Sequence, residues 1–442
     1  RKRFYMFCVA LFTCASFLCG IAWSLETLIF FRVLQGLGGG GLAPSEQAIL
    51  ADAFPPEKRG SAFAIYGLAV VVAPTVGPTV GSAITDYATW HWIFFINIPM
   101  GLLSLFLVGT FVDADQKERA KNDPKRNPWN FDLVGFLLVA LCLGALEVVL
   151  DEGQRSDWFE STFIVVFACL SAAAFVAFIP WELSRRYPLV KVRLLGTRQF
   201  GMCFVMMLVT GGVLFSSIQL IPQLVQTQFG YDATLAGLSL SPGGFVTMAM
   251  MPVAGLLTGW VQPKYLIALG LAIVGISMWT LTDLSFFYAV WTRMFTAAGL
   301  PFLFLPITTA SYAGLKGDDT NQAAGLINIA RNLGGSIGLA MVQTSLQQRE
   351  QFHQSRLVEN TIPSNVHFQD ALRQATIFLQ SSGASAADAM HRANALIAQL
   401  VQQQAVLLSY IDTFWLMAMV CAIAFPFAFL IRPIPLGKGP QH

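Results

Sequence analysis

The sequence predicts an all-α integral membrane protein, and three observations lead to that prediction. Of its 442 residues, 55% are hydrophobic and 12% are charged, whereas a soluble domain carries roughly a quarter charged residues. Apolar runs of about 20 residues, the length of a membrane-spanning helix, recur along the chain. They are unlike the short alternating strands of a transmembrane barrel. The formal net charge of +2 gives no reason to expect a nucleic-acid partner.

Apolar runs separated by charges or by Gly, Pro, Asn and Asp clusters predict twelve transmembrane helices. Their expected ranges are 4–23, 27–50, 61–84, 92–112, 131–150, 161–182, 198–222, 234–259, 264–282, 286–313, 322–345 and 406–431. With Arg1, Lys2 and Arg3 in the cytoplasm, 19 of the 27 Lys and Arg residues fall on the cytoplasmic side, five on the opposite side and three inside spans. This asymmetry follows the positive-inside rule and predicts cytoplasmic termini for the chain.

Two stretches between the spans are expected to lie outside the membrane. Residues 113–130 are charged and contain Pro, which we interpret as a solvated cytoplasmic linker. Residues 346–405 are Gln-rich and are expected on the outer side. In this stretch Ser385 can cap a helix that Ala, Leu and Gln propagate toward the last span. The apolar positions here could dock a partner or pack on the bundle itself.

The chain contains an internal repeat, as expected for a bundle built from duplicated halves. A shift of 261 residues places Arg32 on Arg293 and Gly38 on Gly299. The surrounding segments agree, because LIFFRVLQGLGGGGLAP is similar to AVWTRMFTAAGLPFLFLP. In the same register, the Gly/Pro-rich third span corresponds to INIARNLGGSIGLAM. The repeat therefore pairs spans one to four with spans nine to twelve.

This register leaves spans seven and eight without counterparts and makes spans five and six an inserted pair. We therefore expect a 6+2+6 architecture of fourteen helices, of which this chain holds twelve and lacks the first two; a native twelve-helix protein is the alternative. The expected regions are an N-terminal bundle (1–112), a linker (113–130), the inserted pair (131–182), the first five helices of a C-terminal bundle (198–345), a periplasmic loop (346–405) and the last helix (406–431).

Two motifs carry a resemblance to a known family. FRVLQGLGGG resembles the Arg-containing fourth-helix motif of the major facilitator superfamily. The matching residues there are Arg32, Gln35 and Gly36. APTVGPTVGS resembles the antiporter motif of the fifth helix, with Ser82 where Gly is usual. The matching residues in that motif are Pro74, Gly77, Pro78 and Gly81.

Further segments narrow the resemblance to one branch of this superfamily. WHWIFFINIPMG, LSPGG and NQAAGLINIARNLGGSIGLA look like signatures of the fourteen-span, EmrB/QacA-type drug:proton antiporters. The similarity extends over essentially the whole chain. Arg1, Lys2 and Arg3 resemble the end of the basic motif between the second and third helices of that family. The resemblance thus implies the major facilitator fold.

Three arginines lie inside predicted spans, where a charge costs on the order of 3 kcal/mol on insertion scales. We expect Arg32 to face a cavity, because it belongs to the fourth-helix motif. Arg331 and Arg293 could face a cavity or a packing partner. Arg32 lies about six residues from the outer face and could also extend toward the interface, as long basic side chains do.

Three carboxylates are candidates for coupling or for cation binding. Glu46 follows Arg32 by fourteen residues on the same predicted helix, on a shared face about 21 Å away. It could bind a cation, take up a proton, or pair with a basic residue of the next loop. Glu147 and Asp412 lie near the outer ends of their spans. Asp412 is the better coupling candidate because it belongs to a repeated helix, while both could be interfacial carboxylates.

Small residues predict close helix packing at two places. The prolines and glycines of the antiporter motif offer a bend and a GxxxG surface on one helix. Ala330, Gly334 and Gly338 form a similar ladder at four-residue spacing. We expect these faces to let the two halves meet tightly and rock around a shared site.

The resemblance implies a proton-coupled multidrug efflux transporter of the bacterial inner membrane, with the proton as coupling ion and no other cofactor. It implies hydrophobic or cationic substrates and suggests a periplasmic adaptor and an outer-membrane channel as partners. The alternative is a major facilitator exporter of one endogenous metabolite or siderophore. A membrane enzyme is expected to have clustered His or Asp residues in its spans, and a sensor is expected to have a sizeable cytoplasmic domain. The sequence shows neither feature. The five histidines also lack metal-site spacing.

Overall fold

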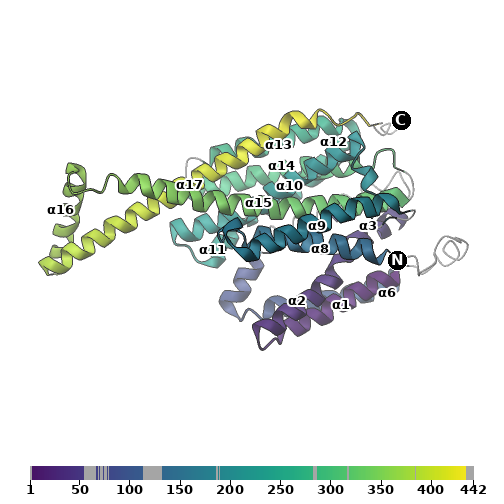
Figure 1. Cartoon of the computed structure of the whole chain (residues 1–442), viewed down its shortest axis with the longest axis horizontal. Helices are drawn as coiled ribbons and strands as arrows, with labels where there is room; N and C mark the ends of the chain where they lie inside the picture. Colours follow the sequence, from purple (N-terminus) through teal and green to yellow (C-terminus); the bar gives the residue numbers. More distant parts are fainter. Residues whose placement is uncertain are drawn as a thin grey trace, which may run out of the picture.

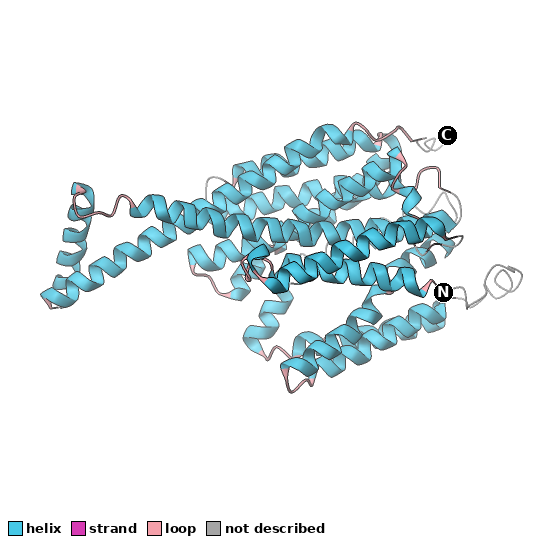
Figure 2. Cartoon of the chain, in the orientation of Figure 1, coloured by secondary structure: helices cyan, strands magenta, loops and turns pink. Residues whose placement is uncertain are grey.

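The structure is a computed structural model, and it describes residues 2–53, 66–67, 69, 73, 77, 79–112, 132–185, 188, 190–281, 286–315, 318–383 and 385–434. These residues form a bundle of long α-helices (Figure 1), and Figure 2 shows helices and loops but no strand among them. Nine helices in the described ranges are long and apolar enough to cross a membrane. The predicted all-α membrane fold is confirmed.

The N-terminal helices show two breaks that the hydropathy pattern did not reveal. The elements are α1 (Lys2–Gly20), α2 (Leu25–Gly40), α3 (Leu42–Ala53), a helical stretch at 79–87, α5 (Trp92–Phe95) and α6 (Asn97–Phe111). The single helix predicted over 27–50 is therefore wrong. It breaks at Gly41, the last of four consecutive glycines, which weaken a helix. The helix predicted over 92–112 breaks at Ile96, because Pro99 cannot donate to a carbonyl one turn earlier.

The inserted pair and the next helices follow their predicted ranges closely, except that the single helix predicted over 234–259 is divided into two. They are α8 (Leu133–Glu152), α9 (Thr162–Ser184), α10 (Arg198–Phe229), α11 (Ala233–Leu238), α12 (Ser241–Trp260), α13 (Pro263–Thr280) and α14 (Phe286–Ser311), with short 3-10 turns η2 (Trp158–Glu160) and η3 (Val192–Leu194). In Figure 1, α8 and α9 run along the edge of the C-terminal helices. Helix α8 packs on α9 and also contacts α15, so the inserted pair is attached to the C-terminal bundle.

The stretch predicted as a loop at 346–405 is mostly helical. It consists of the end of α15 (Asp318–Val358), all of α16 (Val366–Ser381) and the start of α17 (Ala386–Ala428). The predicted cap is confirmed, because the Ser385 side chain accepts a hydrogen bond from the Asp388 backbone N–H and α17 then continues without interruption. Figure 1 shows these segments extending well beyond the bundle. We call residues 346–405 the projecting arm; its place on the periplasmic side stays a prediction.

The contacts of α1 with α2 are repeated between α13 and α14. Gln35 donates to the Ser16 hydroxyl at 3.0 Å. At the positions 261 residues later, the hydroxyls of Ser277 and Thr296 lie 2.9 Å apart. Each pair joins the first two helices of its own repeat, and the two pairs lie at equivalent positions along those helices. The register found in the sequence therefore corresponds to the same contacts in space.

Glycines at equivalent positions of the two repeats also allow close contact between neighbouring helices. A Cβ atom on Gly38 would lie 2.6 Å from the Phe12 backbone nitrogen. A Cβ atom on Gly299 would lie 2.7 Å from Val274 and 3.1 Å from the Gly270 oxygen. Each glycine thus permits its helix to approach the preceding one closely.

The small-residue ladder on α15 does not join the two halves, contrary to the expectation. Gly334 packs against the backbone of Leu208, and a Cβ atom on Gly338 would lie 2.5 Å from Gly212. Leu208 and Gly212 belong to α10, which is in the same C-terminal bundle. The reason is that α10 carries its own glycine pair at 211–212, so the closest approach forms there.

Candidate transport site

A cavity of about 540 Å³ lies where three parts of the chain meet. Gly40 and Pro44 line it from the break between α2 and α3, Glu147 from the inserted helix α8, and Arg331 and Ser336 from α15. We call it the Glu147 cavity. Its volume is in the range of small-molecule sites, which are about 300–1,000 Å³. The glycines leave room for this space, because they add no side chains at the bend.

Two of the predicted site residues, Glu147 and Arg331, meet in this cavity. The Ser336 hydroxyl donates a hydrogen bond of 2.7 Å to the Glu147 carboxylate. Arg331 lines the same wall, and its Nε lies 3.5 Å from the Asn332 side-chain oxygen. A carboxylate and a guanidinium among apolar walls can orient a molecule that has a charged or polar group and a large hydrophobic part. Ser336 was not predicted; its signal was its place one turn from Asn332 on a predicted span.

The fourth-helix motif forms a polar network instead of lining this cavity. Arg32 donates to the Gln35 side-chain oxygen at 3.0 Å, and its guanidinium lies 5.5 Å from the centre of the Phe94 ring. Gln35 is buried and donates to Ser16, which also accepts a 3.0 Å hydrogen bond from Asn97. These contacts tie α1, α2 and α6 together. Gly36 is exposed, and in the described part of the chain no atom lies within 4 Å of where its Cβ would be.

Glu46 lies in a separate cluster of the N-terminal helices. The Tyr5 hydroxyl is 3.2 Å from a Glu46 carboxylate oxygen and 3.3 Å from the Ser104 hydroxyl. The three residues come from α1, α3 and α6. Because the helix breaks at Gly41, Glu46 and Arg32 stand on different helices with different partners. Sequence reasoning missed Tyr5 and Ser104, since neither belongs to a motif.

Asp412 pairs with two residues of the projecting arm. Its Oδ2 lies 2.8 Å from His353 Nε2 and 3.6 Å from Arg349 Nε. This cluster joins the C-terminal part of α15 to the middle of α17. The sequence had placed both partners in a loop, so the cluster was not predicted. Antiparallel helices that stay regular beyond the membrane bring them together.

Arg293 differs from its repeat counterpart in burial. Its side chain is fully buried, and its Nη1 donates a 3.1 Å hydrogen bond to the Ser217 hydroxyl of α10. Gly243 of α12 lies against the same side chain, since a Cβ there would be 3.1 Å from Arg293 Cγ. Arg293 therefore packs within the C-terminal bundle, whereas Arg32 is exposed at the edge of the N-terminal helices.

The antiporter motif can be placed only in part. Pro74 and Pro78 lie outside the described residues. Gly77 and Gly81 are described, and within that part of the chain no atom lies within 4 Å of a Cβ built on either one. The close approach expected at the GxxxG surface therefore stays a prediction.

Just beyond the motif, the helical stretch 79–87 contacts the other half of the chain. The Thr79 hydroxyl donates to the Gly237 oxygen and lies 3.1 Å from the Ser241 hydroxyl. The Thr234 hydroxyl donates to the Asp86 carboxylate. These bonds join the third span to α11 and α12 at the ends expected to be outermost. The two halves are thus held together at the end that is expected to face outward.

Comparison with protein families and known proteins agrees with this architecture. The model of the Major Facilitator Superfamily matches residues 1–339. The multidrug export protein EmrB of Escherichia coli K12 is 29% identical over 442 residues, covering 99% of this chain and 83% of that protein. EmrB of Haemophilus influenzae is 32% identical, covering 94% of this chain and 80% of its own. The fatty acid resistance protein FarB of Neisseria gonorrhoeae is 31% identical, covering 97% and 82%.

A solved structure has the same fold. The crystal structure of a POT family transporter in complex with 5-aminolevulinic acid superposes with a TM-score of 0.56 at 12% identity, over 97% of this chain and 82% of that one. The match covers helices of both halves and of the inserted pair. Given this fold, the matched residues and the relatives above 30% identity, the chain belongs to the major facilitator superfamily, in the branch of the EmrB multidrug export proteins.

Proposed function

We propose that this protein exports several chemically different drugs across the bacterial inner membrane and takes in protons in exchange. The observation that carries the proposal is the similarity, over nearly the whole chain, to proteins named for multidrug export. The Glu147 cavity supports this proposal, because one carboxylate and one guanidinium among apolar walls can bind hydrophobic molecules that carry either a positive or a negative charge.

Alternating access is the mechanism that fits the contacts between the halves. The outer ends of 79–87 and of α11 and α12 are hydrogen-bonded to each other. A bundle closed on the outer side would load its substrate from the cytoplasm or the inner leaflet. Breaking these bonds while the halves rock would open the same cavity outward.

Substitution of Glu147 by Gln tests the proposed site. We expect Glu147→Gln to reduce the efflux of cationic dyes about tenfold, because a contact with a charged group is worth roughly 1.5–3 kcal/mol. Efflux of uncharged dyes should change little. The measurement is dye transport into inside-out proteoliposomes, together with the movement of protons reported by an internal pH indicator. Dye and proton fluxes should fall together.

Glu152→Gln is the matched control for this experiment. Glu152 stands on the same helix, has a partly exposed side chain and pairs with Arg155 at 3.5 Å. It should leave both fluxes unchanged. Equal loss in both variants, or undiminished transport of cations in Glu147→Gln, would count against the Glu147 cavity as the transport site. Dye transport that needs no proton gradient would refute the proposed coupling.

We further propose that the projecting arm docks a periplasmic adaptor protein, which would lead on to an outer-membrane channel. Large apolar side chains are exposed along the arm, which is costly in water and typical of an interaction surface. They include Val358, Ile362, Val366, Ile377, Phe378 and Leu400. The described membrane spans could not use these residues for packing, since the arm extends beyond them.

Removing the arm tests this partnership. Glu350 accepts a hydrogen bond from Gln402, so α15 and α17 are still side by side at that level. Replacing 354–399 by a short Gly-rich turn should therefore keep the bundle folded. We expect the shortened protein to lose co-purification with a co-expressed periplasmic adaptor protein that the full chain retains, while dye transport in proteoliposomes persists. Unchanged adaptor recovery would contradict the proposal.

A further inference from the structure

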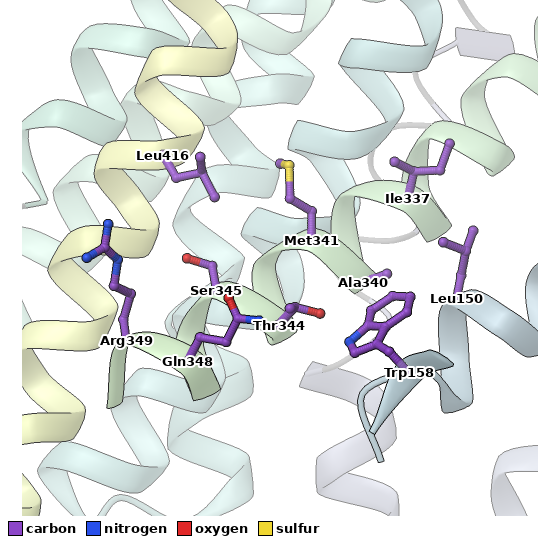
Figure 3. Close-up of a pocket in the computed structure, with 10 residues that line it drawn as sticks. All are labelled: Leu150, Trp158, Ile337, Ala340, Met341, Thr344, Ser345, Gln348, Arg349 and Leu416. Atoms are coloured by element: carbon purple, nitrogen blue, oxygen red, sulfur yellow. The ribbon is translucent and has the colours of Figure 1, made fainter. Parts of the chain in front are cut away.

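A second cavity, of about 560 Å³, lies between the inserted pair and the C-terminal helices at the ends expected to be outermost. Figure 3 shows its walls: Leu150 from α8, Trp158 from η2, Ile337 to Arg349 along α15, and Leu416 from α17. We call it the Trp158 cavity. It shares no lining residue with the Glu147 cavity, and no motif of the family resemblance contributes to it except the end of the α15 segment.

The lining changes in character along α15. Ile337 and Met341 make its deeper part apolar, whereas Ser345, Gln348 and Arg349 make its outer end polar. Twelve residues separate Ile337 from Arg349, which is about 18 Å of helix. This order, apolar toward the membrane centre and basic toward the surface, matches one leaflet of a bilayer. Trp158 comes from the short η2 turn that follows α8, and indole rings favour the membrane interface.

Arg349 can still bind an anion although Asp412 is close. Its Nε lies 3.6 Å from Asp412 Oδ2, too far for a strong hydrogen bond. That same carboxylate oxygen lies 2.8 Å from His353 on the other side. Within the described part of the chain, no acceptor is bonded to the two terminal nitrogens of Arg349, and half of its side chain is exposed. A guanidinium with two donors side by side suits a phosphate.

A buried polar atom in the wall also lacks a partner. The hydroxyl oxygen of Thr344 is shielded from solvent, yet among the described residues nothing hydrogen-bonds to it. An unpaired buried hydroxyl costs on the order of 1–3 kcal/mol. Thr344 lies between the apolar and the polar parts of the lining, which is the level of the ester groups of a lipid whose phosphate reaches Arg349.

We propose that the Trp158 cavity binds an anionic phospholipid of the outer leaflet. Its phosphate pairs with Arg349, and one acyl chain runs along α15 between α8 and α17. The lipid joins the inserted pair to the C-terminal bundle, where direct packing leaves the space open. The proposal requires membrane embedding only and does not depend on which molecules the protein exports.

The test compares lipid binding by variants in nanodiscs of phosphatidylcholine with and without phosphatidylglycerol. Native mass spectrometry counts retained phosphatidylglycerol, and the melting temperature reports its stabilising effect. We expect Arg349→Gln to retain about tenfold less phosphatidylglycerol than the unmodified protein and to lose the melting shift that this lipid causes. Arg349→Lys should restore part of the lipid retention and part of the melting shift, because lysine keeps the positive charge but lacks the paired N–H donors of the guanidinium.

Arg356→Gln is the matched control, because Arg356 lies two turns further out on α15 and touches the same Phe352 ring at 5.6 Å, against 5.8 Å for Arg349. It pairs with Glu359 and does not line the cavity, so retention should stay normal. Met341→Trp should reduce retention by filling the apolar part while leaving Arg349 in place. Equal retention in Arg349→Gln and Arg356→Gln would overturn the proposal. So would displacement of phosphatidylglycerol by equimolar dodecyl phosphate, which would identify a site for free single-chain amphiphiles.

Discussion

Ser16 is the shared acceptor of a network that holds three N-terminal helices together. Gln35 and Asn97 both donate to it at 3.0 Å, and its own hydroxyl donates to the Phe94 oxygen at 2.9 Å. Because Gln35 is buried, its amide would remain unpaired if Ser16 were removed. The fourth-helix motif therefore holds neighbouring helices together in this protein, and Arg32 joins its hydrogen-bond network through Gln35.

A double-mutant cycle on Ser16 and Gln35 should reveal this coupling. We expect Ser16→Ala to lower the free energy of unfolding by about 1–3 kcal/mol, since it leaves the buried Gln35 amide without its acceptor. Gln35→Ala should lower it by only about 0.5–1.5 kcal/mol, because Ser16 keeps its hydrogen bonds with Asn97 and Phe94. The double variant should cost less than the sum, with a coupling of at least about 0.5 kcal/mol. Thermal unfolding in detergent measures all four proteins. Strict additivity would show that the contact contributes nothing.

At single positions, the sequence could identify charged residues in spans but not their partners. Glu147 and Arg331 were predicted separately, and only the fold brings them to one cavity. Arg32 was expected to face a cavity but bonds to Gln35. His353 and Arg349 were assigned to a loop, so their contact with Asp412 could not be foreseen. Intramembrane charge predicts that a partner exists, whereas its identity depends on helix rotation and on contacts far apart in sequence.

Helix ends and breaks show the same limit at the scale of elements. Hydropathy located the spans, because the membrane requires about 20 apolar residues whatever lies beside them. It did not locate the break at Gly41 or at Ile96, although four glycines and Pro99 were visible signals. The helical projecting arm was predicted only from Ser385 onward, where a capping residue precedes helix-forming residues.

The packing of α10 on α15 gives a prediction for glycine at an element interface. A Cβ atom on Gly338 would lie 2.5 Å from Gly212, whereas no atom of the described residues lies within 4 Å of one on Gly325 of the same helix. We expect Gly338→Ala to destabilise the protein by about 1–3 kcal/mol through overpacking. Gly325→Ala should be neutral or stabilising by up to about 1 kcal/mol, because Ala favours the helix. Thermal unfolding of both variants checks the contrast, and similar melting temperatures would contradict it.

At the scale of the molecule, the repeat was the most productive signal in the sequence. It paired Arg32 with Arg293 and Gly38 with Gly299, and the structure gives the glycines equivalent contacts. The two arginines, in contrast, have diverged in burial, since one is exposed and the other fully buried. The close packing of helices within a half is the same in both copies of the repeat. The surroundings of the two equivalent arginines are not, so individual side chains have diverged after the duplication.

The outer contact between the halves yields the last prediction. Thr234 donates to the Asp86 carboxylate, and Thr79 contacts Ser241 at 3.1 Å, so both bonds favour the outer-closed state. Removing the carboxylate by Asp86→Ala should weaken that state by about 1 kcal/mol, which shifts the population toward outer-open about fivefold. Spin labels at the exposed positions Tyr87 and Leu238, in a background without the native cysteines, would report a longer distance. Thr85→Ala is the control, because among the described residues Thr85 bonds only to its own helix, at Gly81 and Ser82. An unchanged distance distribution in Asp86→Ala, or the same lengthening in Thr85→Ala, would show that these bonds do not hold the halves closed.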